Sequence, residues 1–185
     1  MRKNKLITVL LLIASILLCA CSSEGSYKAP ESTFCIQFID VGQGDAALIE
    51  CDGRYMLIDG GDTSAADTVY NLLVDRDIKH LDFLVMTHLH ADHIGGLPKA
   101  LTYATNIDKT ICNSDYADTE IFRKVSKELG TNGATITIPH EGDKYNLGSA
   151  EVEVIYAKAD EPNDSLVLMV TYGDTQFLFT GDIEE

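Results

Sequence analysis

The sequence predicts a mixed α/β domain, with strands at both ends of the folded region and helices between them. Short apolar segments rich in β-formers crowd residues 34–59 and 134–180, whereas residues 64–130 carry the helix-like patterns. The sequence has no internal repeat, and its strands do not alternate regularly with helices, which excludes a simple parallel doubly wound sheet. Because 45% of the 185 residues are hydrophobic, we expect residues 34–185 to form one domain.

Residues 1–20 have the pattern of a secretory signal. A basic head (residues 1–5) is followed by a thirteen-residue apolar run (residues 6–18) and a small residue before the expected cleavage site. The run is shorter than the roughly 20 residues that span a bilayer as a helix. Leu18-Cys19-Ala20-Cys21 resembles the bacterial lipoprotein signal, so Cys21 is the expected lipidation site. Since Cys19 is unusual at its position, an ordinary secretory signal or an uncleaved anchor is the alternative.

Residues 21–33 are small and polar, and we expect them to form a flexible tether. The protein would then be exported and anchored by lipid to the outer face of the bacterial cell membrane, or secreted if no lipid is attached. Without residues 1–20 the chain has 11 basic and 29 acidic residues, a formal net charge of −18. Such a chain lacks a basic surface for phosphate backbones, which argues against strong non-specific nucleic-acid binding.

Three cysteines follow the tether, at Cys35, Cys51 and Cys112. Their number is odd and they lack C-x-x-C spacing, so they fit neither a disulfide framework nor a zinc cluster. We expect them to be small buried side chains.

The first half of the domain begins with short strands joined by glycine-containing turns, one of them the hairpin turn Asp52-Gly53. A helix is expected from Ser64, with Asp67 completing a capping box. The last strand of this half is mostly apolar, as expected when both of its faces are covered. Strands are expected at residues 34–40, 45–51, 54–59 and 81–87.

The second half contains two helices and further strands. A short helix is expected at residues 97–104, and a longer one from about Asp118 until Gly130 ends it. Strands are expected at residues 109–112, 134–139, 151–156, 165–170 and 175–180.

The segment LVMTHLHADHIGG, residues 84–96, concentrates metal-binding side chains behind a buried strand. His88, His90, Asp92 and His93 lie within six residues, and imidazole and carboxylate are both common zinc ligands. His88 and His90, two apart in extended chain, point the same way, whereas Asp92 and His93 follow as the chain turns. This pattern predicts one metal on His88 and His90 and a second on Asp92 and His93. The alternative is a polar surface loop, which suits the isolated His80 and His140 better.

Several motifs resemble those of one family. THLHADHIGG resembles the H-x-H-x-D-H motif of the metallo-β-lactamase superfamily, and LIDGG (57–61) before it and FLFTGD (177–182) after it match further motifs in the expected order. FIDVGQGDAALIE (38–50) and NDSLVLMV (163–170) are similar to the extracellular hydrolase domain of ComEC-type DNA-internalisation competence proteins and their stand-alone relatives. The resemblance covers residues 34–185 and implies a four-layer αββα sandwich.

The resemblance also implies roles for single residues. Two divalent metal ions, zinc or manganese, would be held by the histidine segment and by a bridging carboxylate, Asp182. The alternative for Gly181-Asp182 is an ordinary turn with no role in metal binding. Asp59 would support the ligands from behind. Asp45, in a loop that either borders the pocket or only joins strands, and Asn163 would lie near the site.

The sequence departs from the family pattern in two places. Many members have a further histidine ligand shortly before the strand at residues 165–170, and this sequence has no histidine there. Many members also have a final histidine ligand beyond the bridging acid, which this sequence lacks as well. Either the C-terminal part of the domain is missing or the second metal site is incomplete. We expect the C-terminal part to be missing, because a last strand that leads straight to an exposed end would leave the sandwich open.

A complete site implies metal-assisted hydrolysis. Two divalent ions about 3.5–4 Å apart lower the pKa of a shared water from about 15.7 toward about 7, and Asp92 would be the catalytic residue that orients this water. The competence-type resemblance favours a phosphodiester, while the charge of −18 favours a small phosphoester or nucleic-acid-derived substrate over a long polyanion. Thioesters and lactones are alternatives. The competing function is a non-catalytic surface lipoprotein that binds metal or a partner through the same fold.

Overall fold

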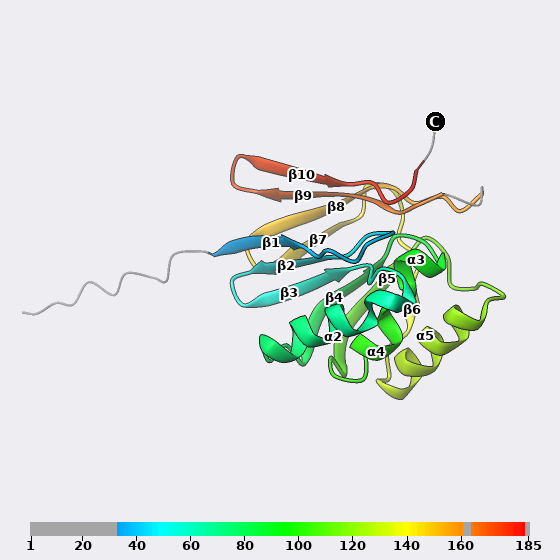
Figure 1. Cartoon of the computed structure of the whole chain (residues 1–185). Coiled ribbons are helices and arrows are strands. Elements are labelled where there is room, and N and C mark those ends of the chain that lie inside the picture. The colour runs from blue at the N-terminus through cyan, green and yellow to red at the C-terminus, as the bar shows by residue number, and fades with distance from the viewer. Residues whose placement is uncertain (1–32, 161–163, 184–185) are drawn as a thin grey trace, which may run out of the picture. The chain divides into compact units, whose positions relative to one another are not determined.

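The computed structural model describes residues 33–160 and 164–183, which form two facing β-sheets with helices on one side (Figure 1). One sheet has six strands in the order β1-β2-β3-β4-β5-β6, and the other has four in the order β10-β9-β8-β7. The larger sheet consists of β1 (Phe34–Phe38), β2 (Ala47–Cys51), β3 (Arg54–Ile58), β4 (His80–Met86), β5 (Asn106–Cys112) and β6 (Ile136–Thr137). The smaller consists of β7 (Lys144–Leu147), β8 (Ala150–Tyr156), β9 (Val167–Tyr172) and β10 (Thr175–Phe179).

The helices cover the outer face of the six-stranded sheet (Figure 1). They are the 3₁₀ turn η1 (Thr63–Ala65) and the helices α2 (Ala66–Asp75), α3 (Ala91–Ile94), α4 (Leu97–Ala100) and α5 (Glu120–Thr131). Three layers of the expected αββα sandwich are thus present, and no helix of the described residues covers the outer face of the four-stranded sheet. None of the helices within the described ranges is long and apolar enough to cross a bilayer.

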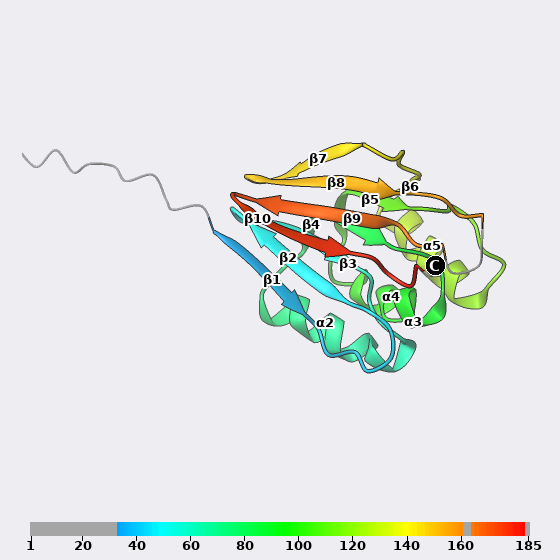
Figure 2. The same ribbon diagram turned by 90° about the horizontal axis from the view of Figure 1, so that it is seen from above.

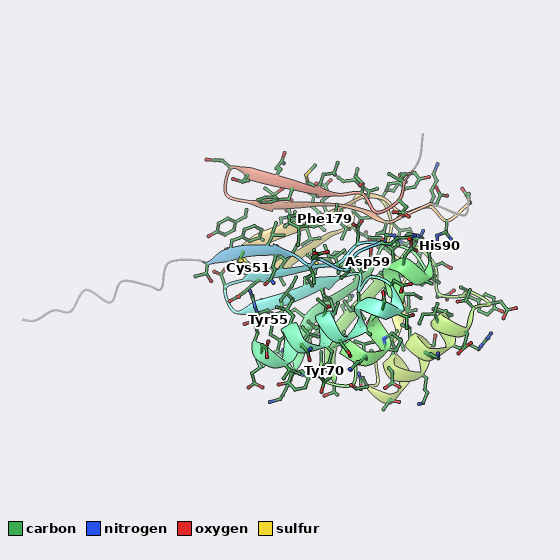
Figure 3. The ribbon with its side chains drawn as sticks, viewed as in Figure 1. Cys51, Tyr55, Asp59, Tyr70, His90 and Phe179 are labelled. Carbon is green, nitrogen blue, oxygen red and sulfur yellow. The ribbon has the colours of Figure 1, made fainter. Side chains whose placement is uncertain are left out.

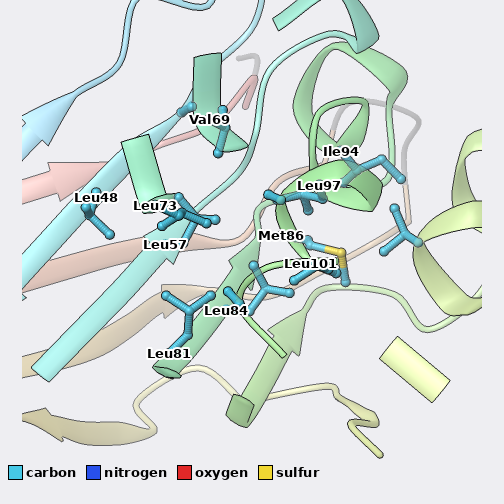
Figure 4. Close-up of a cluster of buried hydrophobic side chains, with 14 of the residues drawn as sticks. Leu48, Leu57, Val69, Leu73, Leu81, Leu84, Met86, Ile94, Leu97 and Leu101 are labelled. Atoms are coloured by element: carbon cyan, nitrogen blue, oxygen red, sulfur yellow. The ribbon is translucent and has the colours of Figure 1, made fainter. Parts of the chain in front are cut away.

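Two apolar cores lie on the two faces of the larger sheet. Side chains alternate along each strand, so Leu48 and Leu57 face the helices while Ile49 and Met56 face the other sheet. The helix side includes Val69 and other wholly buried side chains (Figure 4). The strand β4 contributes to both cores, which explains why its sequence is almost continuously apolar, as predicted.

Aromatic pairs join the two sheets on the side where β10 lies over the β1–β2–β3 part of the larger sheet (Figure 2). The rings of Phe34 and Tyr172 are stacked with centroids 4.6 Å apart, and those of Phe38 and Phe179 lie 6.0 Å apart. Such pairs stabilise by about 0.5–1.5 kcal/mol beyond the area that they bury. The sheets are therefore attached on this side although their strands share no hydrogen bonds there.

The parallel pairing of β3, β4 and β5 sets the position of the site. Leu57 pairs with Leu84 and Ile58 with Val85, so β3 and β4 end side by side. The residue after β3, Asp59, donates its backbone N–H to the carbonyl of Val85 over 2.9 Å. The chain that follows each strand therefore emerges at the same edge of the sheet, where α3 begins after β4.

Several expectations about local structure were wrong. The capping box from Ser64 to Asp67 does not form, because Asp62 caps the preceding 3₁₀ turn by accepting the Ser64 N–H and α2 begins only at Ala66. The short helix α3 and the strand β7 were not predicted. Cys35 is exposed at the edge strand β1, so only Cys51 and Cys112 are buried as expected.

Candidate metal centre

Asp59 is the buried acceptor around which the site is arranged. It has no solvent exposure, and its φ of 55° places it in the left-handed region, which aspartate tolerates better than most residues. Its carboxylate accepts the Thr87 N–H over 2.8 Å, the Thr87 Oγ1–H over 2.6 Å and the His93 Nδ1–H over 2.9 Å. One carboxylate therefore connects the ends of β3 and β4 with α3.

Glycines let the histidine segment approach its neighbours closely. A Cβ on Gly96 would lie 2.2 Å from the carbonyl oxygen of Gly60, and one on Gly95 would lie 2.4 Å from the Thr63 N. Neither position needs a left-handed conformation, so the two glycines are required by backbone contact and not by a tight turn. These contacts pack the segment that follows α3 directly against the chain that follows β3.

Two imidazoles of this segment face a carboxylate from the other sheet. His88 and His93 are buried, and their ring centroids lie 4.2 Å apart. Asp182 follows β10, and its carboxylate lies 3.2 Å from the Nε2 of His93 and 4.0 Å from that of His88. One ligand atom from each of these three residues falls within 4.8 Å of the other two.

The donor set fits a divalent metal ion. The Nε2 atoms of both His88 and His93 are buried without a hydrogen-bond partner, although the carboxylate of Asp182 lies beside them. Buried polar atoms are nearly always paired, so two such atoms that converge on one carboxylate indicate a ligand-binding position. Two imidazole nitrogens and one carboxylate oxygen are ligand types that zinc and related ions accept.

His90 and Asp92 lie at the more exposed side of this group. The exposed His90 precedes α3 and lies near the same end of the sheets as Asp59 (Figure 3), with its ring edge-on to that of His88 at 4.5 Å. Asp92 accepts a hydrogen bond of 3.2 Å from the Gln43 carboxamide. The tight group thus unites His88 with His93, whereas the sequence pattern paired His88 with His90 and His93 with Asp92.

The environment separates the pKa values of the two buried histidines. Burial, followed by the neighbouring His93 and His90, lowers the pKa of His88 to about 4, so this imidazole is neutral and able to bind a metal at neutral pH. Burial opposes the charge of His93 as well, but the hydrogen bond and charge of Asp59, and then Asp182, raise its pKa to about 9. Burial raises the pKa of Asp59 itself.

Two residues of the site were not predicted from the sequence. Thr87 and Ser165 are buried hydroxyls, and each has its oxygen 3.2 Å from the Nδ1 of His88. Ser165 also accepts the backbone N–H of Asp182 over 3.0 Å. Their residue types carry no metal-binding pattern, and only their places directly before His88 and before β9 could have drawn attention to them.

The other predicted positions lie nearby or outside the described residues. Asp45 is exposed and lines a cavity of about 150 Å³ together with Asp59, Thr87 and residues of the β10 end. Asn163 and Cys21 fall outside the described residues. A second hollow of about 290 Å³ lies on the side of His88 and His90, where Tyr116 and Asp164 also line it. Among the residues that the structure describes, no lysine or arginine lines either hollow.

Another histidine–carboxylate cluster, at the start of β4, contrasts with this site. His80, Asp82 and Asp108 also bring ligand atoms within 4.8 Å of one another. However, Asp82 is already paired with Arg54 over 2.7 Å and with the Tyr55 N–H over 2.8 Å. Among the described residues of this cluster no buried side-chain atom lacks a hydrogen-bond partner, so ordinary ion pairing explains it.

The comparison with protein families identifies the class of protein. The model of the metallo-beta-lactamase superfamily matches residues 39–185, and the chain belongs to this superfamily. The prediction of the family and of its fold is confirmed. This fold normally binds divalent metal ions, in agreement with the ligand group around Asp182.

Curated relatives include competence proteins. ComE operon protein 3 of Bacillus subtilis (strain 168) is 25% identical over 172 residues, which cover 81% of this chain and 22% of that protein. Competence protein ComA of Neisseria gonorrhoeae is 25% identical over 177 residues, covering 92% of this chain and 23% of that protein. The chain thus spans less than a quarter of the length of either relative, and the predicted resemblance to competence proteins is confirmed.

Solved structures share the fold at low sequence identity. A metallo-beta-lactamase from Cronobacter sakazakii has a TM-score of 0.56 at 13% identity, covering 78% of this chain and 60% of that chain. The MIM-2 metallo-beta-lactamase has a TM-score of 0.56 at 17% identity, covering 77% and 56%. A flavo di-iron protein from Thermotoga maritima has a TM-score of 0.51 at 19% identity, covering 69% and 31%.

Proposed function

We propose that the protein is an exported metal-dependent hydrolase that cleaves a small phosphodiester. The observation that carries the proposal is the pair of buried Nε2 atoms, on His88 and His93, that lack hydrogen bonds and face Asp182. Membership of the metallo-beta-lactamase superfamily supports it. Zinc is favoured as the metal because the ligands are mainly imidazoles, and manganese is the alternative.

Each residue of the site has a distinct task in this proposal. His88, His93 and Asp182 hold metal, with His90 and Asp92 completing the ligands on the exposed side. When bound, divalent metal would supply an activated water and Lewis-acid stabilisation of charge on the phosphoryl oxygens. Asp92 would orient the attacking water, and Asp59 holds the Nδ1 of His93 so that its Nε2 faces Asp182.

The negative charge of the protein limits the size and charge of the phosphodiester that it could bind. The competence relatives favour a phosphodiester, but a long nucleic acid needs cationic side chains along its path. Within the described ranges no lysine or arginine lines the hollows beside the site, and the chain without residues 1–20 has a net charge of −18. A small phosphodiester with a single charge, whose uncharged portion lies in the hollow near Tyr116, meets least electrostatic opposition.

The metal content and the substrate are tested on the purified full chain. We expect bound zinc or manganese by plasma mass spectrometry, and hydrolysis of bis(p-nitrophenyl) phosphate but little of the monoester or of plasmid DNA. His93→Ala should abolish both metal retention and hydrolysis. His140→Ala is the matched control, because this histidine is 91% exposed and lies in a turn outside the site, so its replacement should change neither property.

Export and lipid attachment are tested in cells. With labelled palmitate, the wild-type protein and the Cys35→Ser control should incorporate lipid, whereas Cys21→Ser should not. Equal labelling of all three proteins would contradict lipidation at Cys21.

A second function, a non-catalytic metal-binding surface lipoprotein, has one observation in its favour. Within the described part of the chain, only three residues of this site bring ligand atoms within 4.8 Å of one another. Bound metal without hydrolysis of any diester, thioester or lactone would favour this second function.

A further inference from the structure

The buried hydroxyls of Thr87 and Ser165 both face the side of the His88 ring that points away from Asp182. Each oxygen lies 3.2 Å from the Nδ1 of His88, and both residues are almost wholly buried, with 2% and 0% exposure. A neutral imidazole carries one proton, on either Nδ1 or Nε2, and hydrogen-bond partners decide which. The two hydroxyls are therefore placed to determine this choice.

The proton of the Thr87 hydroxyl is already assigned. Its Oγ1 lies 2.6 Å from the carboxylate of Asp59, which is an acceptor when ionised and already receives the Thr87 N–H and the His93 Nδ1–H. The Thr87 oxygen can consequently only accept from His88. This requires the Nδ1–H form of His88, which leaves the lone pair on Nε2.

Ser165 connects the same ring with the carboxylate from the other sheet. Its Oγ accepts the backbone N–H of Asp182 over 3.0 Å while facing the His88 Nδ1. The contact is tight, because a Cβ on Gly181 would lie 2.7 Å from the Oγ of Ser165. One serine thus contacts both the ring of His88 and the backbone of Asp182.

We propose that Ser165 is a positioning residue that, together with Thr87, holds His88 in the Nδ1–H tautomer with its Nε2 lone pair directed toward Asp182. The proposal rests on the proposed metal-dependent function for its purpose, but the tautomer itself is a property of the metal-free protein. The two can therefore fail separately.

The test is long-range ¹H–¹⁵N NMR of the full chain, purified in detergent, labelled at histidine and stripped of metal. The His88 signals are assigned by their loss in His88→Asn. In the wild type we expect a protonated Nδ1 and an unprotonated Nε2. In Ser165→Ala the two ring shifts should move toward each other as the Nε2–H form becomes populated, and the dissociation constant for zinc should rise about 10–100-fold, as is typical when a residue that orients a ligand is lost.

Thr110→Val is the matched control, since the Thr110 hydroxyl is also buried but has no hydrogen-bond partner. It should leave the His88 shifts and the zinc affinity unchanged. If Ser165→Ala does not fold by circular dichroism, Ser165→Cys, of similar volume and with a weaker hydrogen-bonding group, should show a partial shift.

Wild-type His88 shifts in the folded Ser165 variant would overturn the proposal, even if that variant were less stable. A wild-type protein that binds no zinc would refute the proposed function instead, and the tautomer measurement would still decide the role of Ser165.

Discussion

Replacing Asp59 by asparagine separates the contribution of its charge from that of its shape. Asparagine tolerates the φ of 55° found at this position, so backbone strain is not expected. The wild-type carboxylate accepts three hydrogen bonds, two from Thr87 and one from His93. The amide oxygen of asparagine can keep the bond from the Thr87 N–H, but its NH₂ group then faces the other two donors.

The magnitude follows from those two bonds. A hydrogen bond to a charged acceptor contributes about 1.5–3 kcal/mol, so the loss of both sets an upper limit of about 3–6 kcal/mol. Rotation of the Thr87 hydroxyl and loss of the His93 Nδ1 proton would turn both groups into acceptors and recover part of this loss. We expect the free energy of unfolding of the metal-free protein to fall by about 2–4 kcal/mol, given the range for buried hydrogen bonds.

Asparagine also removes the carboxylate that accepts the Nδ1–H, so a neutral His93 ring would keep its proton on Nε2, the atom that faces Asp182. Metal affinity should therefore fall about 10–100-fold. Urea denaturation with a chelator present measures the stability, and zinc titration by calorimetry measures the affinity.

Asp82→Asn is the control. Asp82 is also buried and accepts hydrogen bonds from Arg54 and from the Tyr55 N–H, but it lies near the start of β4, away from the site. This change should reduce stability while leaving zinc affinity unchanged. If Asp59→Asn bound zinc as tightly as the wild type, Asp59 would not control the His93 proton, and the reasoning would be refuted.

Three further predictions use other parts of the molecule. Gln43→Ala removes the hydrogen bond to Asp92 and should weaken zinc binding several-fold in calorimetry. The control Gln37→Ala, which removes the hydrogen bond of this β1 residue to Arg76, should leave zinc binding unchanged, and equal effects of the two changes would exclude a positioning role for Gln43. Iodoacetamide at pH 8 should modify the exposed Cys35 and spare Cys112, whose pKa burial raises to about 12, and peptide mapping that found native Cys112 alkylated would contradict its burial. Removing metal present at 100 times its dissociation constant should lower the melting temperature by about 5–11 °C in calorimetry, and an unchanged value would show that the folded chain holds none.

Local patterns in the sequence determined most of the elements of this fold. The alternation of apolar residues predicted nine of the strands within a few residues, because burial of one or both faces of a strand is written directly into its side chains. The long helix α5 was predicted for the same reason, since Phe122, Val125 and Leu129 recur at helical spacing and are buried together. The strand β7 was missed because only Leu147 of its four residues is fully buried.

The residues at which helices begin were less predictable. Asp62, Ser64 and Asp67 are all capable of capping a helix, and the sequence does not say which side chain meets a free N–H. Contact of the glycines behind α3 with the chain after β3 placed the turn η1, and with it the start of α2.

The candidate site divides in the same way. The close spacing of His88, His90, Asp92 and His93 is a local property, and the sequence alone predicted that they would lie together. Strands of two different sheets end at one edge, and this brings Asp182 opposite His88 and His93 and places the two hydroxyls behind His88. Sequence spacing cannot determine the contacts of His88 with Ser165 and Asp182, because they join residues 77 and 94 positions apart whose distance is set by the packing of the sheets.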